Sequence, residues 1–254
     1  MIKLKTSDEI AVMKESGGIL KDVLELVISR VKKGIRLSDL DKYAEQEILK
    51  RNAEPSFKRV KNYRWTLCTS VNDVIVHGIP DDYMLKDGDV VGIDCGVYYK
   101  NFNTDAAWTV RVGNYNKSST MDETDKFLFT GQKALKKAIS MVVKDNYIYD
   151  ISRALQETIE SEKYSVVPSL VGHGVGKELH EDPEIPGFVK GKRTNTPKIV
   201  EGMTLAIEVI YNKGSEEVVY NRNDGWTIST KDGKISGLFE ATVAMTSHGC
   251  IVLT

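Results

Sequence analysis

Hydrophobic side chains recur at helical spacing in two stretches of the chain. Within residues 10–31, apolar side chains stand at i, i+3, i+4 and i+7, which predicts an amphipathic helix of about 25 residues. Thr6 and Glu9 precede this stretch in the arrangement of a capping box. Residues 127–142 repeat the helical pattern behind a similar box at residues 120–123. The pattern therefore predicts two long helices that begin in the same way.

These helices belong to a longer internal repeat. A second helical pattern follows at residues 39–48, and its counterpart lies at residues 150–159. Residues 87–94 and 201–208 share the order acid, Gly, two variable positions, apolar, small, Ile and acid. Because such matches recur in the same order at nearly constant spacing, they indicate two similar halves.

Strand-like segments follow the helices in each half. They are rich in Val, Ile, Tyr and Thr and are separated by Gly, Asn and Asp. Lys100-Asn101 stands between the first two segments as the turn of a hairpin. The expected strands are residues 90–99, 102–112, 204–211, 217–220, 225–230 and 237–246.

Helices followed by strands in each half favour an α+β fold class. We expect two pseudo-symmetric halves with an antiparallel sheet inside and helices packed outside on one face. The expected unit is a single domain, residues 1–254, with an N-terminal repeat at about residues 1–114 and a C-terminal repeat at about residues 115–254.

The composition excludes several classes of protein. The chain has 254 residues, 41% of them hydrophobic, and a net charge of -1, which argues against disorder and against a strongly basic nucleic-acid binder. No apolar run approaches the roughly 18 to 20 residues that span a bilayer, and residues 1–5 lack the apolar segment of a signal peptide. We therefore expect a cytoplasmic protein with no membrane partner.

The chain has only three cysteines and four histidines, which limits the chemistry of any metal site. The cysteines have no CxxC spacing, which disfavours a disulfide framework and a thiolate zinc site. A catalytic metal would therefore depend mainly on carboxylates.

Four acids lie within strand-like segments among apolar neighbours. Asp94 and Asp105 stand on the two arms of the predicted hairpin, and we expect them to face one another or to lie one step off register. Two buried carboxylates so close repel each other unless a cation neutralises them. Glu208 takes the place of Asp94 in the second half, and Glu240 lies in a further strand. For the two aspartates alone, the alternative is a polar, solvated face of the sheet.

Three of the four histidines lie in glycine-containing, turn-like segments. His173 stands among three glycines in residues 172–176, and His180 and His77 lie in similar surroundings. Oxygen-rich sites with one or two imidazoles suit Mn, Fe or Co better than a structural zinc. We expect His248 to be an ordinary structural or surface residue.

The ordered set of motifs resembles the type I methionine aminopeptidases of metallopeptidase family M24. The resemblance covers essentially the whole chain, and the motifs are highly specific as an ordered set. The matching segments are residues 70–73 with 77–80, 93–94 with 104–105, 172–176 with 180–183, 206–208, and 224–227 with 230–232. The resemblance implies the pita-bread fold, in agreement with the internal repeat.

The resemblance also implies a site for two divalent metal ions, which would be Mn, Co, Fe or Zn, with a monovalent cation as a further candidate cofactor. Asp105 and Glu240 would bridge the two metals. Asp94 would complete one metal, and His173 and Glu208 would complete the other. All five of these residues are present in this chain.

Catalytic roles are implied for three residues near the metals. Glu208 would act as the general base that takes a proton from water. His180 would donate a hydrogen bond to the scissile carbonyl, and His77 would contact the amide on the leaving side.

The implied substrate pocket departs from the family pattern at several positions. Phe57 and Leu179 stand where the family usually has Cys and Phe, and Gly96 replaces a usual Thr. These changes bear on how strictly methionine is preferred as the first residue. The substrate-binding residues expected from the resemblance are His77, His180, Tyr63, Cys68, Leu179, Trp226 and Phe57.

The function implied is that of a metal-dependent hydrolase that removes the N-terminal methionine from nascent proteins and peptides, preferentially when the second residue is small. Its partners would be nascent polypeptide N-termini, and we expect a monomer. The basic residues 58–61 and 190–193 offer a contact with the ribosome surface, the alternative being ordinary solvated loops.

Two other functions stay open at this point. One is a pita-bread aminopeptidase with altered first-residue or Xaa-Pro specificity. The other is a non-catalytic pita-bread binding protein, whose expected mark would be the loss of metal ligands.

Overall fold

The computed structural model describes residues 1–113 and 121–254. Its helices are α1 (Ser7–Ser29), α2 (Leu37–Leu49), α3 (Glu123–Ile139) and α4 (Ile148–Ser161), with short 3₁₀ segments η1 (Phe57–Arg59) and η3 (Arg193–Asn195). The long strands are β4 (Val90–Tyr99), β5 (Phe102–Arg111), β9 (Thr204–Asn212) and β12 (Ser236–Thr246). The shorter strands are β1 (Glu54–Pro55), β2 (Leu67–Val71), β3 (Val74–Val76), β6 (Ser165–Val166), β7 (Val171–Gly174), β8 (Glu181–Pro186), β10 (Val218–Tyr220), β11 (Ile228–Thr230) and β13 (Gly249–Val252).

The predicted cap of the first helix is confirmed. The Thr6 hydroxyl accepts a hydrogen bond from the backbone N–H of Glu9 at 3.2 Å, and the Glu9 carboxylate accepts one from the Thr6 N–H at 3.0 Å. These reciprocal bonds satisfy two N–H groups that an α-helix leaves free at its start.

The cap of α3 differs from the prediction. Thr120 lies outside the described residues, and the N-cap is Asp122, with Asp125 rather than Glu123 at the third helical position. The Asp122 carboxylate accepts hydrogen bonds from the N–H groups of Thr124 and Asp125, both at 2.9 Å. A carboxylate also interacts favourably with the positive end of the helix dipole, so the acid is the better cap here.

The strands form a ten-stranded antiparallel sheet and a small three-stranded one. The order along the large sheet is β1-β4-β5-β12-β9-β7-β8, with β2 on β4, β6 on β9 and β13 on β12. The small sheet has the order β10-β11-β3. Strand β11 begins later than predicted because Asp224 Oδ1 accepts hydrogen bonds from the N–H groups of Trp226 and Thr227, which holds this stretch in a turn.

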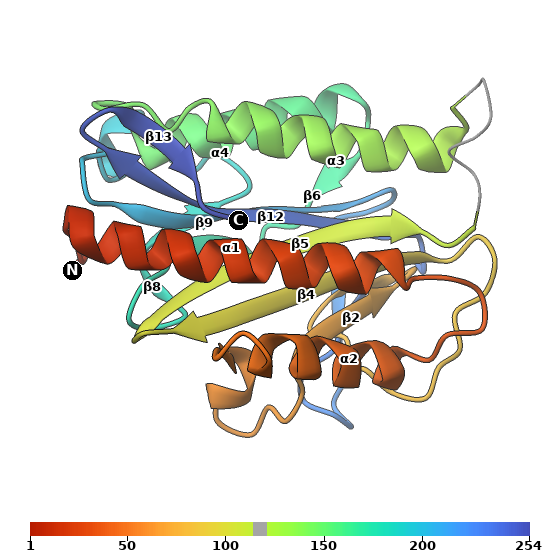
Figure 1. The fold of residues 1–254 in the computed structure, drawn as a ribbon. Coiled ribbons are helices and arrows are strands. Elements are labelled where there is room, and N and C mark those ends of the chain that lie inside the picture. The colour runs from red at the N-terminus through yellow and green to blue at the C-terminus, as the bar shows by residue number, and fades with distance from the viewer. Residues whose placement is uncertain (114–120) are drawn as a thin grey trace.

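The helices cover one face of the large sheet. In Figure 1, α1 and α3 run along the sheet, with α1 packed on β4 and β5 and α3 packed on β9 and β12. The apolar positions predicted for α1 are buried, among them Met13, Leu20 and Val23. The expected α+β architecture, with antiparallel sheet inside and helices outside, is therefore confirmed.

The central hairpin has the predicted turn but a different register at the two aspartates. Lys100 and Asn101 both have positive φ, 46° and 71°, as a two-residue hairpin turn of the right twist requires. Asp94 pairs with Ala107, and Asp105 pairs with Gly96. The aspartates are thus two positions apart in register, so the expectation that they face one another or lie one step off is wrong. An offset of two keeps both side chains on one face, whereas an offset of one would separate them.

Across the described residues, none of the helices combines the length and the apolar composition that crossing a bilayer requires.

Candidate metal centre

A row of paired residues across four strands brings three of the acids together. Asp94 on β4 pairs with Ala107 on β5, which pairs with Glu240 on β12, which pairs with Glu208 on β9. Residues directly opposite one another in an antiparallel sheet project from the same face. The three acids therefore stand on one face of the large sheet.

The other two predicted ligands are displaced by two positions from this row, Asp105 on β5 and His173 on the neighbouring strand β7. Asp105 precedes Ala107 by two positions on β5, and His173 on β7 pairs with Ala206, two positions before Glu208. Because side chains alternate with a period of two, both project from the same face as the first row. The five residues line one cavity of about 120 Å³.

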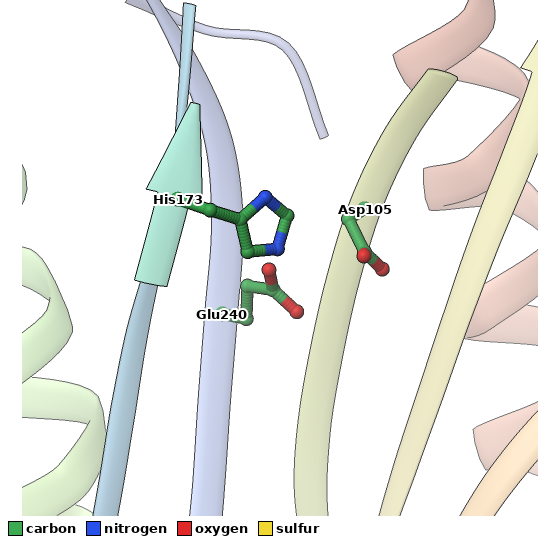
Figure 2. A group of neighbouring side chains, drawn as sticks. All are labelled: Asp105, His173 and Glu240. Carbon is green, nitrogen blue, oxygen red and sulfur yellow. The ribbon is translucent and has the colours of Figure 1, made fainter. Parts of the chain in front are cut away.

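The side chains of this group converge closely. Asp105, His173 and Glu240 each offer a ligand atom, and these atoms lie within 4.8 Å of one another. Figure 2 shows the three side chains pointing toward a common centre from three different strands. His173 Nδ1 lies 2.9 Å from the carbonyl oxygen of Gly174, while its Nε2 lies 3.5 Å from Glu208 Oε1. The backbone contact fixes the ring so that Nε2 faces the acids.

Burial and mutual repulsion disfavour charge on the four carboxyl groups. Burial raises the pKa of Asp105 to about 7. Burial first, and then the charge of Asp105, raises the pKa of Asp94, Glu208 and Glu240 well above the usual range. An opposite charge at the centre would reverse both effects.

Three carboxylate oxygens in the cavity are buried without a hydrogen-bond partner among the described residues. They are Asp94 Oδ1, Asp105 Oδ1 and Glu240 Oε1. Buried polar atoms without partners are rare and costly, so this arrangement calls for a ligand that accepts oxygen lone pairs. Four carboxylates and one imidazole match the donor set of divalent first-row metals. The residues present therefore fit the implied metal centre.

The three histidines near the centre are held neutral at ordinary pH. Burial, with a smaller effect of neighbouring His180, lowers the pKa of His173 to about 4. Burial also lowers the pKa of His180 and, together with the charge of His180, that of His77. The rings of His173 and His180 lie 4.4 Å apart between centroids. A neutral imidazole can offer a lone pair to a metal or donate one N–H to a substrate.

His77 is positioned by an unusual backbone. Its φ is 57°, in the left-handed region that residues with a side chain rarely adopt. A Cβ added to the next residue, Gly78, would lie 2.2 Å from the carbonyl oxygen of Thr69, so only glycine fits there. Such strain persists when the surroundings impose it, and it often marks a functional position. Here it directs His77 into the cavity.

An apolar pocket adjoins the acids. Phe57, Tyr63 and Cys68 form its buried centre, and the partly buried residues around them are Val60, Trp65, Leu179 and Trp226. The rings of Tyr63 and Trp226 lie 5.1 Å apart between centroids. Cys68 pairs directly with Asp94 across β2 and β4, which places the pocket beside the carboxylates.

Polar groups inside this pocket are satisfied and uncharged. The Tyr63 hydroxyl donates a hydrogen bond to the carbonyl oxygen of Leu67 at 2.7 Å and lies 3.2 Å from Cys68 Sγ. Burial raises the pKa of both Tyr63 and Cys68. The pocket therefore suits an apolar side chain.

All of the residues predicted from the sequence for the site line this one cavity. Their individual roles stay predictions. His248 is exposed and lies outside the cavity, as expected. Val76 also lines it and was not anticipated, because nothing distinguishes an apolar pocket residue from an apolar core residue in a sequence.

Comparison with known proteins gives consistent matches over the whole chain. The model of metallopeptidase family M24 matches residues 11–247. A methionine aminopeptidase of Clostridium perfringens is 43% identical, with 100% of this chain and 99% of the relative covered. Methionine aminopeptidase 1 of Bacillus subtilis is 41% identical at the same coverage.

Solved structures agree with the sequence comparison. The crystal structure of methionine aminopeptidase from Thermotoga maritima superimposes with a TM-score of 0.93 at 37% identity and covers 100% of this chain and 99% of that chain. The prolidase from Pyrococcus furiosus, at 22% identity, has a TM-score of 0.74 over 99% of this chain and 65% of that chain. The second likeness shows only a shared fold.

Proposed function

The chain belongs to metallopeptidase family M24, and on this premise we propose that it is a methionine aminopeptidase that removes the N-terminal methionine from new polypeptides. The observation that carries the proposal is the convergence of four acids and one histidine beside an apolar pocket in one cavity. The metal centre would bind the free α-amino group of the substrate, and the adjoining pocket would receive its first side chain. This pairing explains the removal of one residue from a free N-terminus.

The proposed ligands of two divalent metals are Asp94, Asp105, His173, Glu208 and Glu240. When bound, the metals supply positive charge that acidifies water and stabilises negative charge on the scissile carbonyl oxygen. The donor set is compatible with Mn, Co, Fe or Zn, and availability decides among them. A monovalent cation remains a further candidate.

Three side chains would move or hold protons around the scissile bond. Glu208, whose pKa burial raises, is the proposed base that accepts a proton from the attacking water. His180, held neutral by burial, would donate a hydrogen bond to the carbonyl oxygen as negative charge develops there. His77 would contact the amide nitrogen on the leaving side.

The size of the cavity supports the proposed preference for a small second residue. The cavity has to accommodate the first side chain and the scissile bond together, beside the two imidazoles. A bulky second side chain would contact the imidazoles of His77 and His180, which line the same cavity.

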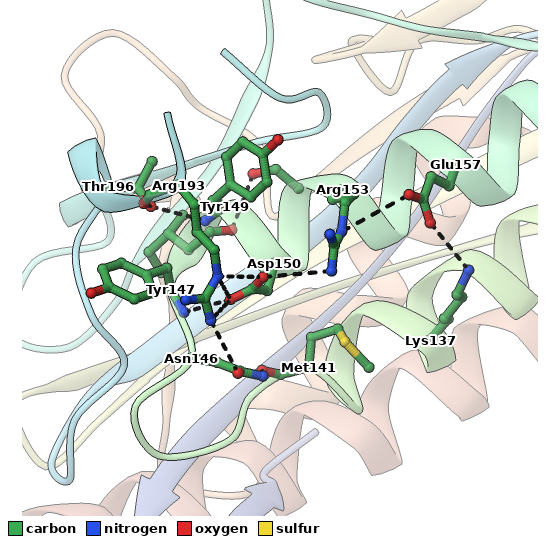
Figure 3. A network of polar contacts seen from close by, with 12 residues as sticks. Lys137, Met141, Asn146, Tyr147, Tyr149, Asp150, Arg153, Glu157, Arg193 and Thr196 are labelled. Carbon is green, nitrogen blue, oxygen red and sulfur yellow. Dashed lines mark hydrogen bonds and ion pairs between the residues drawn. The ribbon is translucent and has the colours of Figure 1, made fainter. Parts of the chain in front are cut away.

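We further propose that the protein acts as a monomer in the cytoplasm, where new N-termini arise. The predicted basic stretches are less available for a contact with the ribosome, because some of their charged side chains form ion pairs within the molecule. Arg193 Nε donates to both carboxylate oxygens of Asp150 at 2.9 Å, and its guanidinium lies over the ring of Tyr147 (Figure 3). Lys58 pairs with Glu45. Such a contact would therefore depend mainly on the exposed Lys61, Lys190 and Lys192.

A peptide-cleavage assay tests the proposed function. The purified protein, treated with chelator and then reloaded with Mn²⁺ or Co²⁺, should cleave Met-Ala-Ser only after reloading. Glu208→Ala should lower kcat by about 100-fold to 10,000-fold because it removes the proposed base. Glu216→Ala, at an exposed position, is the matched control and should retain full activity.

The same assay separates the other two functions. Preferential cleavage of Ala-Pro over Met-Ala peptides would favour Xaa-Pro specificity. No binding of divalent metal in calorimetry would favour a non-catalytic binding protein.

A further inference from the structure

The ring of Phe57 lies directly on the backbone of Gly96. A Cβ added at Gly96 would lie 2.9 Å from Cε1 of the ring and 2.8 Å from Cβ of Ser56. Both distances are shorter than a real Cβ contact permits, so any larger residue at this position requires a rearrangement. The glycine is therefore needed for the ring to occupy its present place.

This contact lies at the edge of the proposed metal centre. Gly96 follows Asp94 by two residues on β4 and pairs with Asp105 on β5. A side chain at position 96 would thus project from the face that carries the acids. Phe57 lines the same cavity as those acids. The ring takes up space that would otherwise belong to the cavity.

The backbone around Phe57 is fixed to the sheet. The N–H of Ser56 donates a hydrogen bond to the carbonyl oxygen of Gly96 at 3.0 Å. The Ser56 hydroxyl donates to Asn103 Oδ1 at 2.9 Å, and both residues are buried. The preceding strand β1 pairs with β4 at Pro55 and Val97. The main chain cannot easily retreat from β4, so displacement of the ring would be directed toward the cavity.

Phe57 also forms one wall of the apolar pocket. Its ring contacts Tyr63 edge-on, with centroids 6.3 Å apart, and Tyr63 in turn packs against Trp226. Leu179 lines another part of the pocket. The width of the pocket therefore depends on how closely the ring of Phe57 lies against β4.

We propose that Gly96 sets the width of the first-residue pocket by letting the Phe57 ring lie against β4, so that a larger residue at position 96 would push the ring into the pocket and narrow it. The inference rests on the proposed function and adds to it the residue that sets the width of the pocket. Phe57 contacts the substrate in this scheme, whereas Gly96 is a positioning residue that acts through Phe57.

Removing the ring tests the wall directly. Phe57→Ala should widen the pocket and raise kcat/KM for Phe-Ala-Ser relative to Met-Ala-Ser by about 10-fold or more, since pocket groups of this size typically discriminate by such factors. Competition by free L-phenylalanine should strengthen relative to free L-methionine in the same variant. Unchanged ratios in a folded Phe57→Ala protein would overturn the proposal.

Displacing the ring from β4 toward the cavity tests the role of Gly96. Gly96→Ala should reduce kcat/KM for Met-Ala-Ser, mainly through KM, by about 10-fold more than for the same peptide with norvaline in place of methionine, because the shorter unbranched side chain needs less room. A merely structural defect would lower both substrates equally, and that result would contradict a role in specificity. In the double variant Phe57→Ala/Gly96→Ala, the selective loss for methionine should largely disappear.

Failure of this inference is distinguishable from failure of the proposed function. If the unchanged protein, loaded with metal, cleaves Met-Ala-Ser but the ratios above do not move, only the inference fails. If it cleaves no N-terminal methionine with any of the metals tested, the proposed function fails first. Thermal unfolding of each variant reports whether the substitution has disturbed the fold.

Discussion

Asp105 interacts electrostatically with each of the other three acids of the metal centre. Burial first, and then the charge of Asp105, raises the pKa of Asp94, Glu208 and Glu240. The Thr242 hydroxyl fixes the backbone of Asp105, since it accepts from the Asp105 N–H and donates to the Asp105 carbonyl oxygen. Without an opposite charge at the centre, these acids favour their protonated forms. The centre thus links proton binding to the stability of the fold.

This linkage predicts an unusual pH dependence for the metal-free protein. Burial raises the pKa of Asp105 from its ordinary 3.8 to about 7, so its contribution to stability is complete below about pH 4 and is lost as the pH rises to about 7. Between these values, the free energy of unfolding of the metal-free protein should fall by up to about 4 kcal/mol more than that of Asp105→Asn. Urea unfolding in EDTA at a series of pH values measures both curves.

A matched surface variant controls for general charge effects. Asp22→Asn replaces an exposed acid on α1 and should follow the unchanged protein across the same pH range. Parallel curves for the unchanged protein and Asp105→Asn would rule out the linkage. Added Mn²⁺ should raise the unfolding temperature of the unchanged protein more than that of Asp105→Asn at pH 7.

At the residue scale, the sequence identified the chemistry but not its spacing. The acids were recognisable because Asp94 and Glu208 stand at matching places in the repeat, in otherwise apolar strands. The predicted offset between Asp94 and Asp105 is wrong because the two aspartates stand at unequal distances from the turn, six residues before Lys100 and four after Asn101. Three-dimensional contacts such as Phe57 on Gly96 involve residues far apart in the chain and leave no local pattern.

At the scale of elements, the segment before α1 is fastened beside His180. Lys5 Nζ pairs with Glu181, the residue that follows His180, and the two side chains are only 5% and 2% exposed. Lys5 Nζ also donates to the carbonyl oxygen of Lys3 at 2.8 Å. A buried pair of this kind is costly to break, because the remaining charge stays buried without a partner.

Breaking this pair should therefore destabilise the protein strongly. Lys5→Met leaves Glu181 without its cation and should lower the free energy of unfolding by about 3 to 5 kcal/mol. Urea unfolding at pH 7 provides the measurement. The matched control is Lys177→Met, whose pairing with Glu9 is largely exposed and should be worth about 1 kcal/mol or less. Similar losses in the two variants would show that burial of the Lys5 pair has little effect.

The helices and strands themselves were largely predictable. The pattern of residues 10–31 sufficed for α1 because its apolar face is continuous, and β4 and β5 were marked by β-branched residues around a Lys-Asn turn. The predicted cap of α3 is wrong because Thr120 and Glu123 match the usual capping-box pattern, whereas the observed box is formed by two acids, Asp122 and Asp125. Short strands such as β3 and β7 exist through pairing with distant strands and have no pattern of their own.

At the scale of the whole molecule, Asn103 joins the two predicted halves. Its Nδ2 donates to the carbonyl oxygens of Gly176 and Lys177 at 3.1 and 3.0 Å, and its Oδ1 accepts from Ser56. The side chain is buried, so these bonds are shielded from water. One amide thus connects β5 with the loop after β7 and with the segment that carries Phe57.

Replacing this amide should weaken the molecule as a unit. Asn103→Leu leaves the Ser56 hydroxyl and the Lys177 carbonyl oxygen without their partner, while the Gly176 carbonyl oxygen keeps the backbone N–H of residue 103. The change should cost at least about 2 kcal/mol in the free energy of unfolding. Asn195→Leu, at an exposed position in η3, should change it by about 0.5 kcal/mol or less. Chemical unfolding followed by tryptophan fluorescence and by circular dichroism measures both. A loss in Asn103→Leu no larger than in Asn195→Leu would refute this role.

The position of β12 has a consequence for how the protein folds. It is the last long strand in the chain, yet it lies between β5 and β9 in the large sheet. Until it arrives, each of these strands presents an open edge of unpaired N–H and C=O groups, and Glu240 is missing from the centre. During synthesis, the facing edges of β5 and β9 therefore stay unpaired until nearly the whole chain has been made. Protection of those edges, more than the strength of any finished contact, would then govern the yield of folded enzyme.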